Sequence, residues 1–488
     1  MRDNGDKEQG QPVAALLGGD PSAARRSQQR STEKLVLLHL SDIHFRSHDN
    51  GDPDEDLRNE LERDAVRVIN RIGHVDGVLV TGDIAFSGKA REYDMAAEWL
   101  DRLCALIGCP IEDVWVIPGN HDVNRDAIGR DQLIPLVHKD VRPDVSVDAP
   151  RDISRHIDAH LNALLGTEAG DKFFASIEQF NRFALRFGCQ STRTQLVWED
   201  DLPLNDGSTL RLRGINSTLV SGPHDNLGTN KLVVGGRQSL PPSHDGVAYL
   251  TLCHHPPRWL CDEDQVNDHL GNRVTIQLFG HRHRQRADKI NESLRLAAGA
   301  VHPGRDEPEW EPRYNVLSID VLVNNDGRFL RVVIWPRVYR AASFLPDNTY
   351  TAPGGESQTY LLRLAKWDGP PFSSPNTDPP QEATPMVMSP TTSAGALAPS
   401  QRKRATNAER RLVFRFFGLG YADIMTIAAK LYLFSNEDEG VNDTERFQRY
   451  YHRAKSRDLL PTLWEEVERR YSDGNTEANP FAQTKPVA

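Results

Sequence analysis

The stretch from Lys34 to Asp122 constrains the fold most, because three short apolar runs in it each end in a cluster of acidic, amide or imidazole side chains. The runs, at 34–40, 77–81 and 114–118, are rich in aliphatic and β-branched residues and too short for helices, so they predict buried strands. Apolar residues at helical spacing predict helices over 55–72 and 90–107. This alternation predicts neighbouring parallel strands whose carboxyl ends share one edge of a sheet.

The polar clusters lie where ligands collect in such sheets, beyond the carboxyl ends of the strands. They are Ser41-Asp42-Ile43-His44, Gly82-Asp83 and Gly119-Asn120-His121-Asp122. Two later runs, 247–253 and 274–279, lead in the same way into His254-His255-Pro256-Pro257 and Gly280-His281-Arg282-His283. Oxygen and imidazole donors without cysteine suit Mn²⁺, Fe or Zn²⁺, and about seven donors are too many for one ion. We therefore expect two metal ions about 3.5–4 Å apart that share a carboxylate.

The order Asp-x-His, Gly-Asp, Gly-Asn-His-Asp, His-His-Pro-Pro and Gly-His-x-His resembles the calcineurin-like metallophosphoesterase superfamily. The resemblance implies an α/β (α+β) fold, a four-layer sandwich of two mixed β-sheets flanked by helices. It also implies the ligand set: Asp42, His44 and His283 for the first metal, Asn120, His254 and His281 for the second, and Asp83 as the bridge.

The same resemblance places His121 beside the phosphate, where it would stabilise charge or protonate the leaving oxygen. We favour His254 over His255 as the ligand because it comes first off the strand, and we expect His255 to turn away. Asp122 would be an outer carboxylate that could orient a ligand imidazole. A histidine at a strand end is commonly only a polar cap, but burying several carboxylates and imidazoles together without a cation would be costly.

The arginines Arg282, Arg284 and Arg286 around the last block have two interpretations. They could bind substrate phosphate through bidentate hydrogen bonds. Alternate residues beyond a strand are more often a solvated rim, however, and both interpretations stay open.

The composition changes along the chain and predicts five segments. These are a disordered leader (1–33), the metallophosphoesterase domain (34–366) with a helical insertion at about 125–200, a linker rich in Pro, Ser and Thr (367–408), a small all-α domain (409–472) and a disordered tail (473–488). Runs at 294–300, 314–322 and 329–339, the last two joined by a hairpin sequence at 324–327, predict a second, antiparallel-rich sheet.

The segment 409–472 carries apolar residues at helical spacing and predicts a bundle of four or five helices. The sequences at 416–421 and 459–464 resemble effector-associated or Death-like adaptor domains of bacterial defence and signalling proteins. This resemblance implies a protein partner. Acidic residues at 437–445 precede basic residues at 446–457, so head-to-tail self-association is possible, and a solvated bundle with ordinary surface charge is the alternative.

The composition excludes some classes of function. A net charge of −11 and a pI near 5.9 argue against binding long nucleic acid by bulk charge. Five cysteines without a paired framework predict reduced thiols, no apolar run approaches the length of a membrane span, and the leader lacks a signal-peptide core. We expect a cytoplasmic protein.

The sequence favours a metal-dependent phosphoric ester hydrolase, with Mn²⁺ preferred and Fe or Zn²⁺ possible. We expect a phosphodiesterase that uses metal-activated water on a nucleotide, cyclic nucleotide or short nucleic acid, and that is recruited through its C-terminal domain. A phosphomonoesterase or protein phosphatase is the enzymatic alternative. A non-catalytic scaffold that uses the phosphoesterase fold is the other, although the complete set of ligands argues against it.

Overall fold

The computed structural model describes residues 34–47, 54–143, 152–304, 310–351, 355–369, 399–471 and 478–482. The predicted leader, most of the predicted linker and most of the predicted tail lie outside the described residues. Within these ranges no single helix has the length and apolar character to cross a membrane. One bent pair, Ala408–Phe417 with Tyr421–Lys430, meets that criterion by length and composition when joined across a 118° bend.

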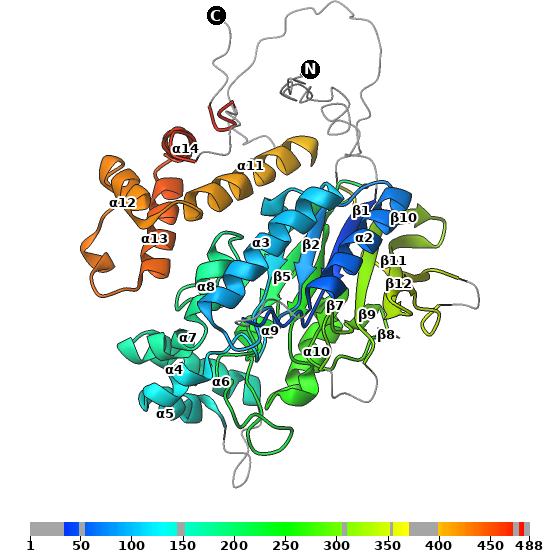
Figure 1. Ribbon diagram of the computed structural model, residues 1–488, viewed down its shortest axis with the longest axis horizontal. Helices are drawn as coiled ribbons and strands as arrows, with labels where there is room; N and C mark the ends of the chain where they lie inside the picture. The colour runs from blue at the N-terminus through cyan, green and yellow to red at the C-terminus, as the bar shows by residue number, and fades with distance from the viewer. Residues whose placement is uncertain are drawn as a thin grey trace, which may run out of the picture. The chain divides into compact units, whose positions relative to one another are not determined.

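The first sheet has seven strands and contains the three predicted parallel strands (Figure 1). Its order is β12-β11-β10-β1-β2-β3, and β13 also pairs with β11. The bounds are β1 Leu35–Leu40, β2 Gly77–Val80, β3 Val114–Val116, β10 Arg313–Asn324, β11 Gly327–Arg340, β12 Ser343–Pro346 and β13 Gln358–Arg363. The helices between the first three strands, α2 (Glu55–Ile72) and α3 (Ala90–Ile107), have the bounds that the apolar spacing predicts, and both lie across this sheet (Figure 1).

The second sheet has six strands in the order β4-β5-β6-β7-β9-β8. They are β4 Trp198–Pro203, β5 Thr209–Ile215, β6 Val247–Cys253, β7 Ile276–Phe279, β8 Arg286–Ile290 and β9 Ser293–Ala297. The four central strands are parallel, and β4 and β8 are antiparallel to their neighbours. The later two histidine blocks therefore follow strands of the second sheet, and the first three blocks follow strands of the first.

The predicted membership of the second sheet is wrong for two strands. The hairpin of β10 and β11 turns at 324–327 as predicted, but β10 pairs antiparallel with β1 and so extends the first sheet. The predicted strand at 294–300 does join the second sheet, as β9. The physical reason is that the strand-helix-strand order leaves one edge of β1 open, and nothing local in the sequence says which later strand pairs with it.

Helices fill the segment between the third and fourth blocks. They are α4 Arg125–Arg130, α5 Leu133–Val141, α6 Ile153–Leu165, α7 Lys172–Ala175 and α8 Glu178–Leu185, with a short 3₁₀ turn η2 at Glu168–Asp171. The shorter elements η1 (Ile111–Asp113), α9 (Gly236–Ser239), η3 (Pro257–Trp259) and α10 (Glu263–Arg273) complete the phosphoesterase region.

One hydrophobic core contains side chains of both sheets. Trp115 of β3 is fully buried in it, and Trp198 of β4 donates its indole N–H to the carbonyl oxygen of Val116 at 3.0 Å. A buried indole N–H needs an acceptor, and here the acceptor belongs to the other sheet. The bond therefore joins an edge strand of one sheet to an edge strand of the other.

The C-terminal helices form a small bundle with a separate core. They are α11 Pro399–Phe417, α12 Tyr421–Lys430, α13 Asp443–Ser456 and α14 Leu460–Glu468, with a 3₁₀ turn η4 at Asn436–Asp438. Leu412, Phe416, Ile427, Tyr450 and Trp464 are among the buried residues of this core. The all-helical region is thus the small domain that the apolar stripes predict.

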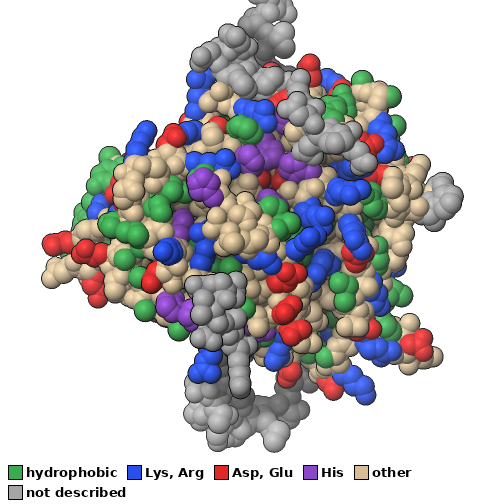
Figure 2. Space-filling view, turned by 90° about the horizontal axis from the view of Figure 1, so that it is seen from below, with side chains coloured by type: hydrophobic (Ala, Val, Ile, Leu, Met, Phe, Trp, Pro, Cys, Tyr) green, Lys and Arg blue, Asp and Glu red, His purple; other side chains and the backbone are tan. Residues whose placement is uncertain are grey.

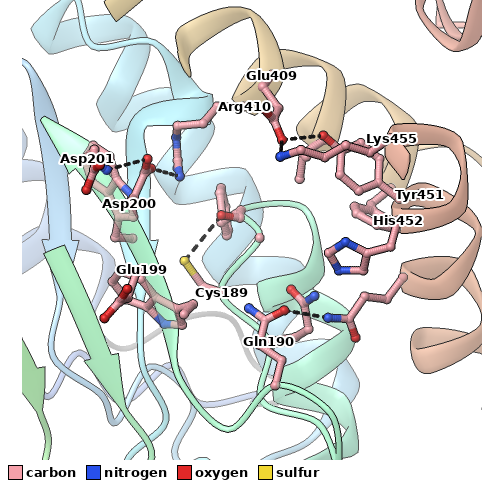
Figure 3. Close-up of a pocket in the computed structure, with 18 of the residues that line it drawn as sticks. Cys189, Gln190, Glu199, Asp200, Asp201, Glu409, Arg410, Tyr451, His452 and Lys455 are labelled. Carbon is pink, nitrogen blue, oxygen red and sulfur yellow. Dashed lines mark hydrogen bonds and ion pairs between the residues drawn. The ribbon is translucent and has the colours of Figure 1, made fainter. Parts of the chain in front are cut away.

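Helix α11 also contacts the phosphoesterase region, beside a cavity of about 530 Å³ (Figure 3). The guanidinium of Arg410 lies 4.4 Å from the centre of the Trp115 ring and donates to Asp200. Glu409 accepts from Lys455 (Figure 3), and Arg211 pairs with Asp201 at 2.6 Å and with Glu199 at 3.8 Å. The charged lining residues of this cavity therefore satisfy one another.

Candidate metal centre

The ends of β1 and β2 hold the first donors side by side. The amide of Asp42 donates to the carbonyl oxygen of Gly82 at 3.0 Å, and the amide of His44 donates to that of Asp83 at 3.0 Å. The loop after β3 closes on the same point, because the amide of His121 donates to Oδ1 of Asp83 at 2.7 Å. Three blocks that are distant in the sequence therefore meet through hydrogen bonds of their backbone amides, two to backbone carbonyls and one to the carboxylate of Asp83.

The two sheets meet at Gly280, the first residue of the last block. Its amide donates to the carbonyl oxygen of His254 at 3.0 Å. A Cβ atom at Gly280 would lie 2.5 Å from Oγ of Ser41 and 2.8 Å from Nδ1 of His254. Only a residue without a side chain allows this approach, which brings the later histidines to Asp42 and Asp83.

The backbone is strained at several of the predicted ligands. Five of them have positive φ angles between 52° and 69°: Asp42, His44, Asp83, His281 and His283. Left-handed backbone is unfavourable for residues other than glycine, and it persists where the surroundings impose it, commonly at ligand sites.

The first donor cluster consists of Asp42, His44 and His283, whose nearest ligand atoms all lie within 4.8 Å of one another. Nε2 of His283 is 3.3 Å from Oδ1 of Asp42. Nδ1 of His44 donates to the carbonyl oxygen of His302 at 3.0 Å, which leaves Nε2 facing Oδ2 of Asp83 at 3.4 Å. A backbone carbonyl can only accept, so this bond fixes the tautomer of His44.

The second donor cluster surrounds the amide oxygen of Asn120. Oδ1 of Asn120 lies 2.8 Å from Nδ1 of His281 and 3.2 Å from Nε2 of His254. Nδ1 of His254 donates to the carbonyl oxygen of Thr81 at 2.7 Å, and its Nε2 lies 3.2 Å from Oδ2 of Asp83. Asp83 thus stands between the two clusters, and its role as a shared ligand stays a prediction.

His255 departs from the expectation that it turns away. Its Nε2 lies 3.2 Å from the same Oδ1 of Asn120, and its Nδ1 lies 2.8 Å from Oγ of Ser217. The chain turns directly after β6, so successive side chains do not alternate between opposite faces here. Both His254 and His255 are therefore within reach of one cation.

Asp122 also has a different role from the predicted one. Its carboxylate accepts from the amides of Gly119, Ile84 and Ala85 at 2.9, 3.2 and 2.9 Å, and from the hydroxyl of Tyr93 at 2.9 Å. Among the described residues it contacts backbone and Tyr93 rather than an imidazole. Asp122 therefore ties the loop after β3 to the loop that carries Asp83.

His121 lies at the open side of the first cluster. Its Nδ1 donates to the carbonyl oxygen of Phe86 at 2.8 Å, and its ring stacks on the Phe86 ring with centroids 5.1 Å apart. The ring of His44 is 4.7 Å away. Burial lowers the pKa of His121. The hydrogen bond to Phe86 leaves Nε2 available to a molecule at the centre.

The charges of the centre suit a divalent cation. Burial opposes ionisation of Asp83, but the positive charge of His254 and its hydrogen bond hold the pKa of Asp83 well below its usual range. Despite burial, the same attraction raises the pKa of His254 to about 9. Burial and the charge of His254 lower the pKa of His281 to about 4. The centre thus combines an ionised Asp83 with a neutral His281, the protonation states that metal ligands need, while the proton that Asp83 holds on His254 would be released on binding of a cation.

Arg282 and Arg284 are exposed, and no described hydrogen bond or ion pair joins either side chain to the donor clusters. Arg286 is also exposed and pairs with Asp288 at 2.6 Å. Figure 2 shows histidine side chains gathered at the surface of one face, with Lys and Arg side chains beside them. The rim interpretation of the three arginines agrees with this placement.

Four residues at the centre were missed by the sequence reasoning: Arg46, Phe86, Trp259 and His302. Trp259 packs edge-on against the ring of His281, with centroids 4.3 Å apart. His302 follows β9 by a few residues, so a search for every histidine just past a strand could have found it. Phe86 and Arg46 carry no such pattern, because an aromatic ring and an arginine after a strand are common.

Comparison with known proteins agrees with this geometry. The family model for calcineurin-like phosphoesterases matches residues 35–285, which is more than half of the chain, and that for the GTPase-associated adaptor domain matches residues 408–469. An uncharacterised metallophosphoesterase-like protein of Bacillus subtilis (strain 168), YydB, is 26% identical over 325 residues. The match covers 63% of this chain and 61% of that protein, so the chain spans about three fifths of the length of this curated relative.

Solved structures match with low scores. Vps29 from Entamoeba histolytica, complexed with zinc, has a TM-score of 0.27 and 10% identity, and the match covers 67% of this chain and 99% of that one. The purple acid phosphatase PPD1 from yellow lupin seeds has a TM-score of 0.32 and 11% identity over 71% of this chain and 58% of that one. From its family model and its sequence blocks, the chain belongs to the calcineurin-like phosphoesterase family and carries a GTPase-associated adaptor domain at its C-terminus.

Proposed function

We propose that the protein hydrolyses phosphodiesters with two divalent metal ions. The observation that carries this proposal is the position of Asp83, whose Oδ2 faces Nε2 of His44 at 3.4 Å and Nε2 of His254 at 3.2 Å. One ion would be held by the first cluster and one by the second, with Asp83 shared: Asp42, His44 and His283 on one side, and Asn120, His254 and His281 on the other, with His255 within reach. Carboxylate, amide and imidazole donors suit Mn²⁺, Fe or Zn²⁺.

When bound, such ions supply a water of lowered pKa and stabilise negative charge on a phosphoryl group. The chain contributes the rest. Backbone carbonyls of His302 and Thr81 hold the rings of His44 and His254 with a lone pair toward the centre. His121, held through its Nδ1 by Phe86, would donate a proton from Nε2 to the leaving oxygen in its imidazolium form, which the charge of Asp83 favours and burial opposes.

A diester preference is supported by the openness of the centre. His121, His281 and His283 are only partly buried, and histidines reach the surface of this face (Figure 2). A substrate that carries a group on each side of the phosphate can therefore extend along the surface. We place nucleotides, cyclic nucleotides or short nucleic acids in this class.

The adaptor domain would bring the enzyme to a protein partner. The segregated charges that suggested head-to-tail association are largely paired within the domain. Asp438 accepts from Arg453 at 2.6 Å, and Glu445 accepts from Arg449 at 2.6 Å. Charges that are already paired attract a second copy of the domain less strongly. We therefore propose that the adaptor domain binds a different protein.

The test compares bis(4-nitrophenyl) phosphate with 4-nitrophenyl phosphate in the presence of Mn²⁺, alongside metal analysis of the purified protein. We expect two equivalents of metal, a higher kcat/KM for the diester, and at least about a thousandfold loss in Asp83→Asn together with loss of bound metal. Asp126→Asn, which changes an exposed carboxylate paired with Lys89, is the matched control.

A preference for the monoester would make the protein a phosphomonoesterase. A protein without metal, whose cellular role survives Asp83→Asn, would be a scaffold.

A further inference from the structure

An exposed aromatic ring stands beside the centre. The Phe86 side chain is 37% exposed although it stacks on His121, and it also packs edge-on against His44 at 6.1 Å. Its backbone is fixed, because the amide of Phe86 donates to the carbonyl oxygen of Phe45 at 3.0 Å while its own carbonyl holds His121.

Arg46 covers this ring. The Cζ atom of Arg46 lies 3.8 Å from the centre of the Phe86 ring, which is close contact for a guanidinium on an aromatic face. Its Nε is buried and has no hydrogen-bond partner among the described residues, and no described carboxylate forms an ion pair with it. Stacking therefore fixes the plane of the guanidinium, while its Nε–H makes no hydrogen bond to another described residue.

Arg46 differs in this from many other arginines of the chain. The protein carries a net charge of −11, and arginines elsewhere are commonly paired, as Arg286 is with Asp288. A planar guanidinium with free donors suits bidentate binding of phosphate. Arg46 and His121 both stack on Phe86, so one substrate molecule can contact both side chains.

We propose that Arg46, held flat by Phe86, binds a second, non-scissile phosphate of the substrate, so that the enzyme prefers phosphodiesters that carry another phosphate group, as short oligonucleotides do. This inference rests on the proposed function, because it assumes that the scissile phosphate lies between the two donor clusters. Arg46 then acts in substrate selection and does not take part in the bond cleavage.

The test uses two substrates that differ by one phosphate, thymidylyl-thymidine and its 5′-phosphorylated form, with Mn²⁺ present. We expect the phosphorylated dinucleotide to have the higher kcat/KM in the unmodified protein. Arg46→Gln should lower that value about 10- to 100-fold, the loss expected for one charge-assisted hydrogen-bonding group, and change thymidylyl-thymidine and bis(4-nitrophenyl) phosphate less than about twofold. Arg46→Lys should restore only part of the preference, because lysine keeps the charge and loses the planar stack.

Arg286→Gln is the matched control. This exposed arginine lies outside the site, so its substitution should change kcat/KM for neither dinucleotide. Equal losses of Arg46→Gln on all substrates, or none, would overturn the inference while hydrolysis of the diester leaves the proposed function standing. If no diester is hydrolysed, the proposed function fails, and binding of the two dinucleotides to metal-free protein decides the inference. Equal affinities, or affinities that Arg46→Gln does not change, reject it.

Discussion

At the scale of the residue, a substitution of His121 can distinguish a role in positioning the substrate from a role in protonating the leaving group. Its Nε2 is the ring atom left free by Phe86, so a residue without a transferable proton should slow substrates with poor leaving groups. We expect His121→Asn to lower kcat for thymidylyl-thymidine by about 10²- to 10⁴-fold. The loss on bis(4-nitrophenyl) phosphate should be much smaller, because 4-nitrophenolate leaves without a proton. Steady-state kinetics with both substrates checks this, and equal losses would contradict a proton-donating role.

The residues at the centre were predictable to the extent that each follows a strand in a recognisable block. The geometry brings together every side chain that the blocks nominate as a donor, because the carboxyl ends of the strands converge. His255 and Asp122 were misjudged for a different reason. Their partners, Asn120 and the amides around Asp83, are distant in the sequence, and the direction of a side chain in a turn depends on such partners.

At the scale of the element, periodicity located buried strands and failed for the two edge strands of the second sheet. The strands β1 and β6 are almost wholly buried and apolar, and both were predicted within one residue of their bounds. The edge strand β4 has the sequence Trp-Glu-Asp-Asp-Leu-Pro, and β8 has Arg-Ala-Asp-Lys-Ile, so neither shows an apolar run. Edge strands are commonly charged, since charge discourages pairing with other chains, and their sequences then read as loops.

Helix α14 shows an element whose stability should depend on pH. Glu466 is buried in the adaptor domain and accepts from Lys430 at 2.6 Å, Arg469 at 2.6 Å and Arg470 at 2.9 Å. Burial alone would raise the pKa of Glu466, but these hydrogen bonds lower it from 4.5 to about 2. A depressed carboxyl pKa adds stability that is present above about pH 4.5 and is lost as the pH falls toward 2.

We expect Glu466→Gln to lower the unfolding temperature of the adaptor helices by several degrees at pH 7, in line with about 1 kcal/mol for a domain of this size. The difference from the unmodified protein should shrink as the pH falls from 4.5 toward 2. Thermal unfolding of the full chain, followed by circular dichroism across this pH range, measures it. Glu465→Gln, which changes the exposed neighbour, should have little effect, and a pH-independent difference would show that Glu466 acts through packing alone.

At the scale of the whole molecule, the assignment of strands to sheets decides where the centre lies. The blocks come from strands of two sheets, and they meet only because the ends of β1, β2, β6 and β7 converge around Gly280. The family resemblance implies two sheets, but the local pattern could not place β10 beside β1. Pairing between distant strands depends on the whole core, which a window of sequence does not contain.

Arg410 makes several of the hydrogen bonds between the adaptor domain and the phosphoesterase region. Its guanidinium donates to Asp200 (Figure 3) and, over the face of Trp115, to the carbonyl oxygens of Glu112 at 2.8 Å and Val114 at 3.0 Å. Arg410→Gln would leave buried acceptors without their donor, a strongly unfavourable change. Hydrogen–deuterium exchange of the full chain should then show α11 exchanging about tenfold faster or more, with hydrolysis of bis(4-nitrophenyl) phosphate unchanged within about twofold, because no metal donor is touched.

Arg446→Gln, which breaks a pair with Asp443 inside α13, should leave exchange in α11 unaltered. Unchanged exchange in Arg410→Gln would mean that the adaptor domain moves independently of the phosphoesterase region, and a parallel loss of activity would mean that the contact supports the centre through β3.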